Sequence, residues 1–213
     1  MTKATVTDEG KKALSDLLII VIATFAAMAF FIPFQEPIYQ FARDQGQPVL
    51  LRTLAMALIQ FGVAGLGISL VMLIRRERFS QYGLIKRGAL LSIGLSVLAF
   101  VPNIVFEFAT GRADGYFPFQ SVWMTREILT APFPVPLAGV GLIAVAWGFF
   151  EGFNYVVICR KINCRFPSRN RWLNWGALTC AVMCILIHGM IGLTPEGILE
   201  ALTVMVIIYG MLM

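Results

Sequence analysis

The segment LAGVGLIAVAWGFFEGFNYVVI, residues 137–158, contains a single charged residue, Glu151. About 20 consecutive apolar residues is the length that a helix needs to cross the hydrocarbon core of a bilayer. The whole chain follows the same trend, because 58% of its 213 residues are hydrophobic and only 14% are charged. A soluble domain carries about 25% charged residues. The composition therefore predicts an integral membrane protein and excludes soluble enzymes, disordered tails and disulfide scaffolds.

Hydropathy places six spans in the chain, and none of them alternates with the period of two that a barrel strand shows. The spans cover residues 13–34, 49–74, 89–106, 137–158, 172–193 and 197–213. We therefore expect an all-α, polytopic transmembrane bundle that forms one integral membrane domain over residues 1–213.

The basic residues predict the orientation of this bundle. Thirteen of the 17 lie before the first span, between the second and third, or between the fourth and fifth. Loops rich in Lys and Arg stay in the cytoplasm, so both termini are predicted to be cytoplasmic. The same charges fit contact with anionic lipid, so the expected partner is the bilayer of a prokaryotic plasma membrane and not nucleic acid. The aromatic and proline-rich stretch 107–136 is then an outer-side interfacial loop or half-helix.

Polar residues at membrane depth are costly and are therefore candidates for function. Glu151, Asn154 and Tyr155 follow one another at i, i+3 and i+4, which places them on one helix face. His188 is the one histidine in the sequence. Gln60 and Asn103 are lesser candidates. Glu151 fits either a hydrogen-bonded lock between helices or a general base or ion ligand, and the sequence leaves both open.

Two further patterns lie in these spans. Ala144, Gly148 and Gly152 form a ladder of small residues at four-residue spacing, which favours close approach of another helix. A second column, Cys180, Cys184 and His188, has ligands that suit a soft metal. The column steps too far along the helix for all three to reach one ion. We therefore interpret its cysteines as small packing residues.

The order of three motifs resembles the CPBP family of intramembrane metalloproteases, which includes the type II CAAX prenyl endopeptidases. The motifs are RERFSQYGL at 76–84, FFEGFNY at 149–155, and His188, which follows Glu151 by 37 residues. The resemblance covers about residues 75–213. The family's spans carry E-E-x-x-x-R, F-x-x-x-H and H-x-x-x-N. Glu151 matches one glutamate of the first motif and His188 matches the histidine of the second.

This resemblance implies a metal, expected to be zinc, held by His188 and Glu151, with Asn154 and Tyr155 in support. It implies hydrolysis of a peptide or a membrane protein, in which the metal activates a water and the glutamate takes its proton. The first motif's arginine falls on Tyr155 or Val156, and no third motif is present in the 213 residues. Because a catalytic zinc usually has three protein ligands, we expect a remnant or altered site.

Two other functions also fit the sequence. A non-catalytic membrane scaffold or immunity-like interaction protein would use the ladder of Ala144, Gly148 and Gly152 to bind a partner. A small ion-coupled transporter would use Glu151 and His188 to relay protons or hold a cation.

Overall fold

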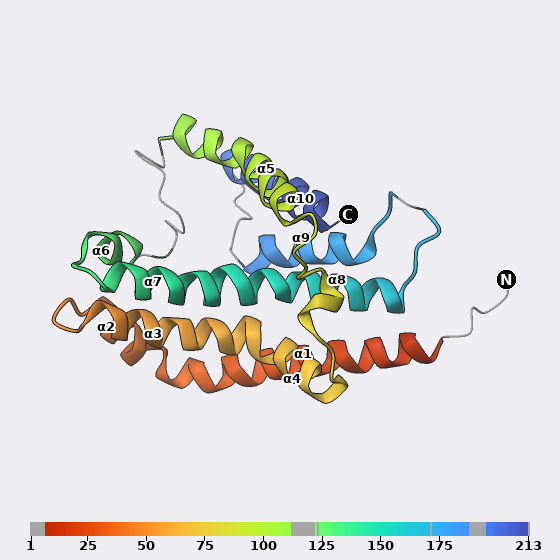
Figure 1. Ribbon diagram of the computed structural model, residues 1–213, viewed down its shortest axis with the longest axis horizontal. Coiled ribbons are helices and arrows are strands. Elements are labelled where there is room, and N and C mark those ends of the chain that lie inside the picture. Colours follow the sequence, from red (N-terminus) through yellow and green to blue (C-terminus); the bar gives the residue numbers. More distant parts are fainter. Residues whose placement is uncertain (1–6, 112–121, 123, 171, 188–194, 213) are drawn as a thin grey trace. The chain divides into compact units, whose positions relative to one another are not determined.

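A computed structural model of the chain describes residues 7–111, 122, 124–170, 172–187 and 195–212. Every regular element in this part of the chain is helical (Figure 1). The elements are α1 (Asp8–Phe31), η1 (Ile32–Phe34), α2 (Gln35–Arg43), α3 (Val49–Gln60), η2 (Phe61–Gly65), α4 (Leu66–Arg75), η3 (Phe79–Tyr82), α5 (Ala89–Ala109), α6 (Thr125–Thr130), α7 (Val135–Ile143), η4 (Ala144–Phe150), α8 (Glu151–Arg165), α9 (Trp175–Ile187) and α10 (Pro195–Leu212).

Four of the helical stretches are long and apolar enough to cross a membrane. They are Asp8–Arg43, Val49–Arg75, Ala89–Ala109 and Val135–Arg165, and they contain the first four spans expected from hydropathy. The two remaining expected spans correspond to α9, an apolar helix of 13 residues, and to α10, which has 18. Residues 188–194, between these two helices, lie outside the described part of the chain. The number of crossings and the side of each terminus stay predictions.

The backbone divides into two compact units, each of which we consider by itself. Unit 1 holds the described residues of 1–17, 78–116 and 156–213, and unit 2 holds those of 18–77 and 117–155. The division falls within two helices, α1 and α8. The single membrane domain expected from the sequence stays a prediction.

In unit 2, α3 and α6 pack against α7 (Figure 1). The buried centre of this packing is Val122, Met124, Ile128 and Ile143. A glycine permits the close approach, because a Cβ atom at Gly139 would lie 2.5 Å from Cγ2 of Ile128. The short helix α6 is therefore anchored by one fully buried side chain, within the stretch predicted as an interfacial loop or half-helix. Residues 112–121 and 123 of that stretch lie outside the described residues.

The later part of α1 packs closely against the α3–η2–α4 stretch within unit 2. A Cβ atom at Gly67 would lie 2.8 Å from the Cα atom of Ile20, so only glycine fits there without a shift of the backbone. The Thr24 hydroxyl donates a hydrogen bond of 2.9 Å to the carbonyl oxygen of Val63. These two contacts join the first two candidate spans.

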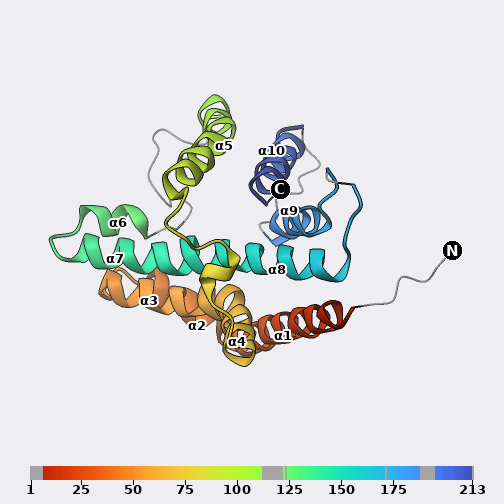
Figure 2. The same ribbon diagram turned by 45° about the vertical axis from the view of Figure 1, so that its right-hand side comes forward.

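In unit 1, α10 packs against both α9 and α5, and Figure 2 shows α10 next to α9. The start of α9 lies close to α8, where a Cβ atom at Gly176 would stand 2.2 Å from the carbonyl oxygen of Cys159. Pro102 lies inside α5, where its ring removes one backbone hydrogen bond from the helix. In unit 1, α10 therefore packs with α9 and α5, and the start of α9 lies close to α8.

Candidate functional site

A carboxylate and an amide meet near the middle of two candidate spans. Nε2 of Gln60 donates a hydrogen bond of 2.7 Å to Oε2 of Glu151. Gln60 lies 11 residues after the start of Val49–Arg75 and Glu151 lies 14 residues before the end of Val135–Arg165. At 1.5 Å per residue these positions are about 17 Å and about 21 Å from the helix ends. Glu151 is thus directed at a neighbouring helix at a depth where a carboxylate is costly.

Two π-helical segments flank this pair. One, η2, begins directly after Gln60, and the other, η4, ends directly before Glu151. Single π-helical turns are rare and are frequent at functional sites. The rings of Phe61 and Phe150 meet edge to face, with centroids 4.8 Å apart. A Cβ atom at Gly65 would lie 2.4 Å from Cδ2 of Phe61, so a glycine is required beside these rings.

Asn154 and Tyr155 lie one turn further along α8. Oδ1 of Asn154 is buried and has no hydrogen-bond donor within the described part of the chain. Tyr155 is buried. His188 lies outside the described residues, so its meeting with Glu151 stays a prediction. Of the residues singled out from the sequence, the structure brings together Glu151 and the lesser candidate Gln60.

The described residues alone do not provide a zinc site. Nowhere among them do three or more His, Cys, Asp or Glu side chains gather closely enough to hold a metal ion. Cys180 and Cys184 are buried within unit 1 and are not in a disulfide, which fits their interpretation as packing residues. A zinc site therefore stays a prediction that depends on His188.

The ladder of small residues does not keep the geometry that its spacing assumes. Ala144 and Gly148 lie in η4, where hydrogen bonds run from i to i+5 and residues four apart no longer stack as in an α-helix. Gly148 and Gly152 are exposed. A Cβ atom at Gly152 would meet no described atom within 4 Å. This face is therefore open in unit 2.

An ion pair that the sequence did not indicate is buried in unit 1. Nζ of Lys161 lies 2.8 Å from Oδ2 of Asp16, and these residues are 7% and 1% exposed. The ring of Tyr82, in η3, lies 5.7 Å from Nζ of Lys161 and 5.0 Å from Cζ of Arg160. Arg160 also donates to the carbonyl oxygen of Gln81. The stretch 76–84 is thus joined to α8, and α8 to the start of α1.

A second polar network in unit 1 joins the start of α9 to the end of α10. Oδ1 of Asn174 accepts a hydrogen bond of 2.7 Å from Nδ2 of Asn163, and Nδ2 of Asn174 donates one of 3.0 Å to the carbonyl oxygen of Leu212. The Tyr209 hydroxyl accepts from the backbone nitrogen of Asn174 at 3.1 Å and donates to the carbonyl oxygen of Trp172 at 2.6 Å. Asn directly before an apolar run is a typical N-cap, so the sequence did hold a signal for Asn174.

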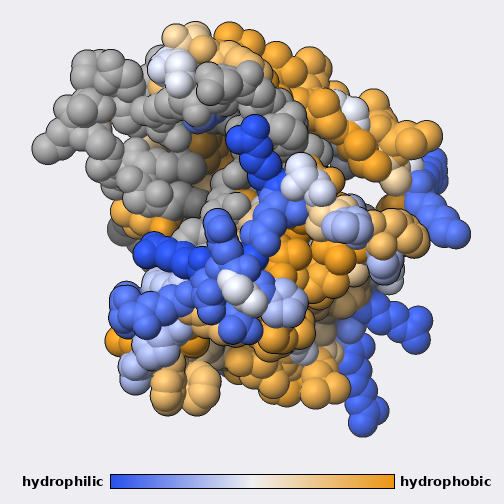
Figure 3. Space-filling model, turned by 90° about the vertical axis from the view of Figure 1, so that its left-hand side faces the viewer, coloured by the Kyte–Doolittle hydropathy of each residue, from blue (hydrophilic) through white to orange (hydrophobic). Residues whose placement is uncertain are grey.

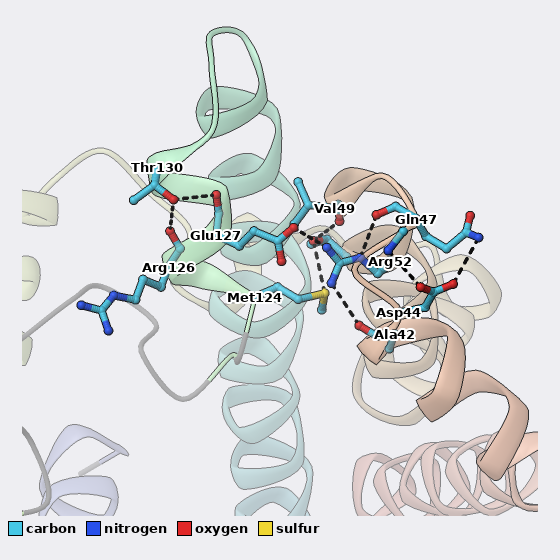
Figure 4. A network of polar contacts seen from close by, with 11 residues as sticks. Ala42, Asp44, Gln47, Val49, Arg52, Met124, Arg126, Glu127 and Thr130 are labelled. Atoms are coloured by element: carbon cyan, nitrogen blue, oxygen red, sulfur yellow. Dashed lines mark hydrogen bonds and ion pairs between the residues drawn. The ribbon is translucent and has the colours of Figure 1, made fainter.

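The corresponding network in unit 2 is built around Arg52 (Figure 4). This side chain is 2% exposed. Its Nε donates to the carbonyl oxygen of Gln47 at 3.1 Å, its Nη1 donates to that of Ala42 at 3.3 Å, and its Nη2 pairs with the carboxylate of Glu127. Figure 3 views the molecule from the side on which α2 and α6 lie in Figure 1, and it shows hydrophilic side chains gathered beside hydrophobic surface. Arg52 therefore fastens the turn before α3 to α6.

No family model, curated protein or solved structure matches the chain. The resemblance to the CPBP family thus rests on the motifs at 76–84 and 149–155 and on His188, and it stays a prediction.

Proposed function

We propose that the chain is a polytopic membrane protein with six crossings and both ends in the cytoplasm. Contacts within each unit support this topology. In unit 1, Lys161 near the end of α8 meets Asp16 near the start of α1, and Asn174 before α9 meets Leu212 at the end of α10. These are the helix ends that the basic residues predict to be cytoplasmic. In unit 2, Arg52 joins two segments that the same rule puts on the outer side.

We further propose that Glu151 is the working carboxylate of an altered CPBP-type site. The observation that carries this proposal is the 2.7 Å hydrogen bond from Gln60, made near mid-span between two π-helical segments. An amide that donates to a carboxylate oxygen fixes the direction of the carboxylate, which a positioned proton acceptor needs. The polar side chain of Gln60, in α3, thus holds the carboxylate of Glu151 in place.

The reaction class implied by the resemblance is hydrolysis of a peptide bond in a peptide or membrane protein. Glu151 would accept the proton of the attacking water while Gln60 holds its carboxylate, and the resemblance implies His188 as a further residue of the site. A bound zinc would supply Lewis acidity to that water. Because the described residues do not themselves form a three-ligand site, we assign no step to the metal.

The test compares four forms of the protein purified in detergent: wild type, Glu151→Gln, His188→Ala and the control Glu107→Gln. Glu107 is a partly buried carboxyl group in α5 and is not one of the residues of the proposed site. Zinc per chain and cleavage of a farnesylated CAAX peptide are measured. We expect cleavage by wild type and the control, and none by the other two. Absence of both zinc and cleavage in all four forms would overturn the enzymatic proposal.

The open face at Gly148 and Gly152 supports a second candidate function, that of a non-catalytic interaction protein. Both glycines are exposed, and a side chain at Gly152 would meet no described atom. A partner helix seated there would be displaced by Gly148→Leu or Gly152→Leu but retained by Glu151→Gln. Gly141→Leu is the control, since Gly141 is equally open on α7. Unchanged recovery of cross-linked partners in all the variants would count against this function.

A further inference from the structure

The connection between α8 and α9 lies within unit 1 and joins the end of α8 to the start of α9. The candidate span Val135–Arg165 ends at Arg165, and the apolar helix α9 begins at Trp175. In the proposed topology both helix ends face the cytoplasm, so the intervening residues lie at the level of the lipid headgroups. Residue 171 of this connection is outside the described residues.

Three exposed aromatic side chains lie at this predicted level of the lipid headgroups. Phe166 is 51% exposed, Trp172 is 69% exposed and Trp175 is 43% exposed. Tryptophan is enriched at membrane–water interfaces, where its ring sits among the headgroups. The backbone beneath these rings is held in place, because the Trp172 nitrogen donates to Oδ1 of Asn170 at 3.0 Å and its carbonyl accepts from Tyr209. The rings are therefore presented by a fixed connection.

The charge of this region is positive without local compensation. No acidic residue occurs between Glu151 and Glu196, whereas the α8–α9 region carries several basic ones. Lys161 is paired with Asp16. In the part of the chain that the structure describes, neither Arg165 nor Arg169 makes an ion pair. Two arginines thus stand at the headgroup level with their charges unbalanced by the described protein.

Arg165 is also under-satisfied as a donor. Its Nε is buried and has no acceptor among the described residues, while its Cζ lies 4.8 Å from the centroid of the Phe166 ring. A ring over one face of a guanidinium leaves the in-plane edge as the direction for hydrogen bonds. Along that edge, Nε and one Nη form the fork that matches two oxygens of a phosphate.

We propose that Arg165 and Arg169 form a binding site for the phosphate of an anionic phospholipid, with Phe166 and Trp172 against its glycerol and upper acyl chain. The charge and the fork geometry select a phosphate, and the position beside apolar helix ends selects a lipid over a soluble anion. The proposal uses the topology proposed above but not the Glu151 site. Loss of zinc or cleavage would therefore leave it standing.

The test uses purified protein in a neutral detergent, titrated with phosphatidylglycerol or with phosphatidylcholine, and counts retained lipid by native mass spectrometry. We expect retention of phosphatidylglycerol, weakened about fivefold by each of Arg165→Gln and Arg169→Gln. Arg165→Lys should lose part of the affinity, since it keeps the charge but loses the fork. The double variant Lys86→Gln, Arg87→Gln is the control and should bind as wild type does. Both of its residues are exposed, in the turn before α5.

Three results would overturn the proposal. Equal retention of phosphatidylglycerol and phosphatidylcholine would show that the protein does not select for the negative charge of the lipid. An equal loss in the Lys86, Arg87 control would show a diffuse surface charge and not a site. Displacement of the lipid by millimolar inorganic phosphate would show a site for a soluble anion. Melting temperatures in lipid-free detergent confirm that each variant is folded, so a loss of binding is separable from unfolding.

Discussion

Two of the carboxylates in the candidate spans, Asp16 and Glu151, are held differently. Asp16 meets the ammonium of Lys161 at 2.8 Å, whereas Glu151 meets the amide of Gln60 at 2.7 Å. Asp16 is 1% exposed and stands in the first part of α1. Glu151 is only partly buried and stands near the middle of its span. An ion pair offsets both charges of its partners, but an amide orients a carboxylate without neutralising it.

Under the proposed function, this difference separates a structural role for Asp16 from a functional one for Glu151. The Asp16–Lys161 pair ties α1 to α8 near the predicted inner surface, and nothing about it requires chemistry. In the proposal, the Gln60–Glu151 pair directs a proton acceptor at mid-span, where a carboxylate is costly. The comparison therefore predicts opposite responses to substitution, with large effects on folding at Asp16–Lys161 and small ones at Glu151.

The largest expected effect is that of Lys161→Met. Removing the ammonium leaves the Asp16 carboxylate buried without its cation, which costs about 3–5 kcal/mol of unfolding free energy. Denaturant unfolding in detergent, followed by helical circular dichroism, measures the loss. The double variant Asp16→Leu, Lys161→Met removes both charges and should recover most of it. Wild-type stability of the single variant would contradict the structural role assigned to this pair.

A smaller loss of unfolding free energy is expected from Gly176→Ala. Gly176 lies in unit 1, as the Asp16–Lys161 ion pair does. The new methyl group would lie 2.2 Å from the carbonyl oxygen of Cys159, and backbone at such a contact must shift, at a cost of about 1–3 kcal/mol. Gly152→Ala, directly after Glu151, is the matched control because its new methyl group meets no described atom. The same unfolding assay should find the control at least as stable as wild type. Equal losses in both would show that the α8–α9 approach is not tight.

Tyr209→Phe should lower the unfolding free energy by a smaller amount, about 1–1.5 kcal/mol. It removes one hydroxyl that accepts from Asn174 and donates to Trp172, while the ring and its packing remain. Hydrogen exchange at the start of α9 should rise, since the connection loses its tie to α10. Unchanged exchange there would show that the Asn174 cap holds the connection without Tyr209.

Several parts of this description follow from the sequence in physical terms. Long apolar runs predicted the four helices that are long and apolar enough to cross a membrane, because a bilayer admits helices of that length. The cost of a carboxylate at depth singled out Glu151. The partners of the buried charges did not follow, since Gln60 and Glu151 are 91 residues apart and hydropathy does not say which helices pack together. The π-helical segments could not be predicted from the sequence either, because the inserted residue of a π-helical turn is stabilised by its packing and leaves no pattern in the sequence.

The smallest effect on stability is expected from Glu151→Gln. The side chain keeps its shape, and its amide oxygen can still accept the hydrogen bond from Gln60, so unfolding free energy should change by less than about 1 kcal/mol. Function should respond in the opposite way, because an amide cannot accept the proton that the proposed site transfers. A loss as large as that of Lys161→Met would instead make Glu151 a structural lock. The two carboxylates would then be alike, and the proposed site would have to be sought away from Gln60.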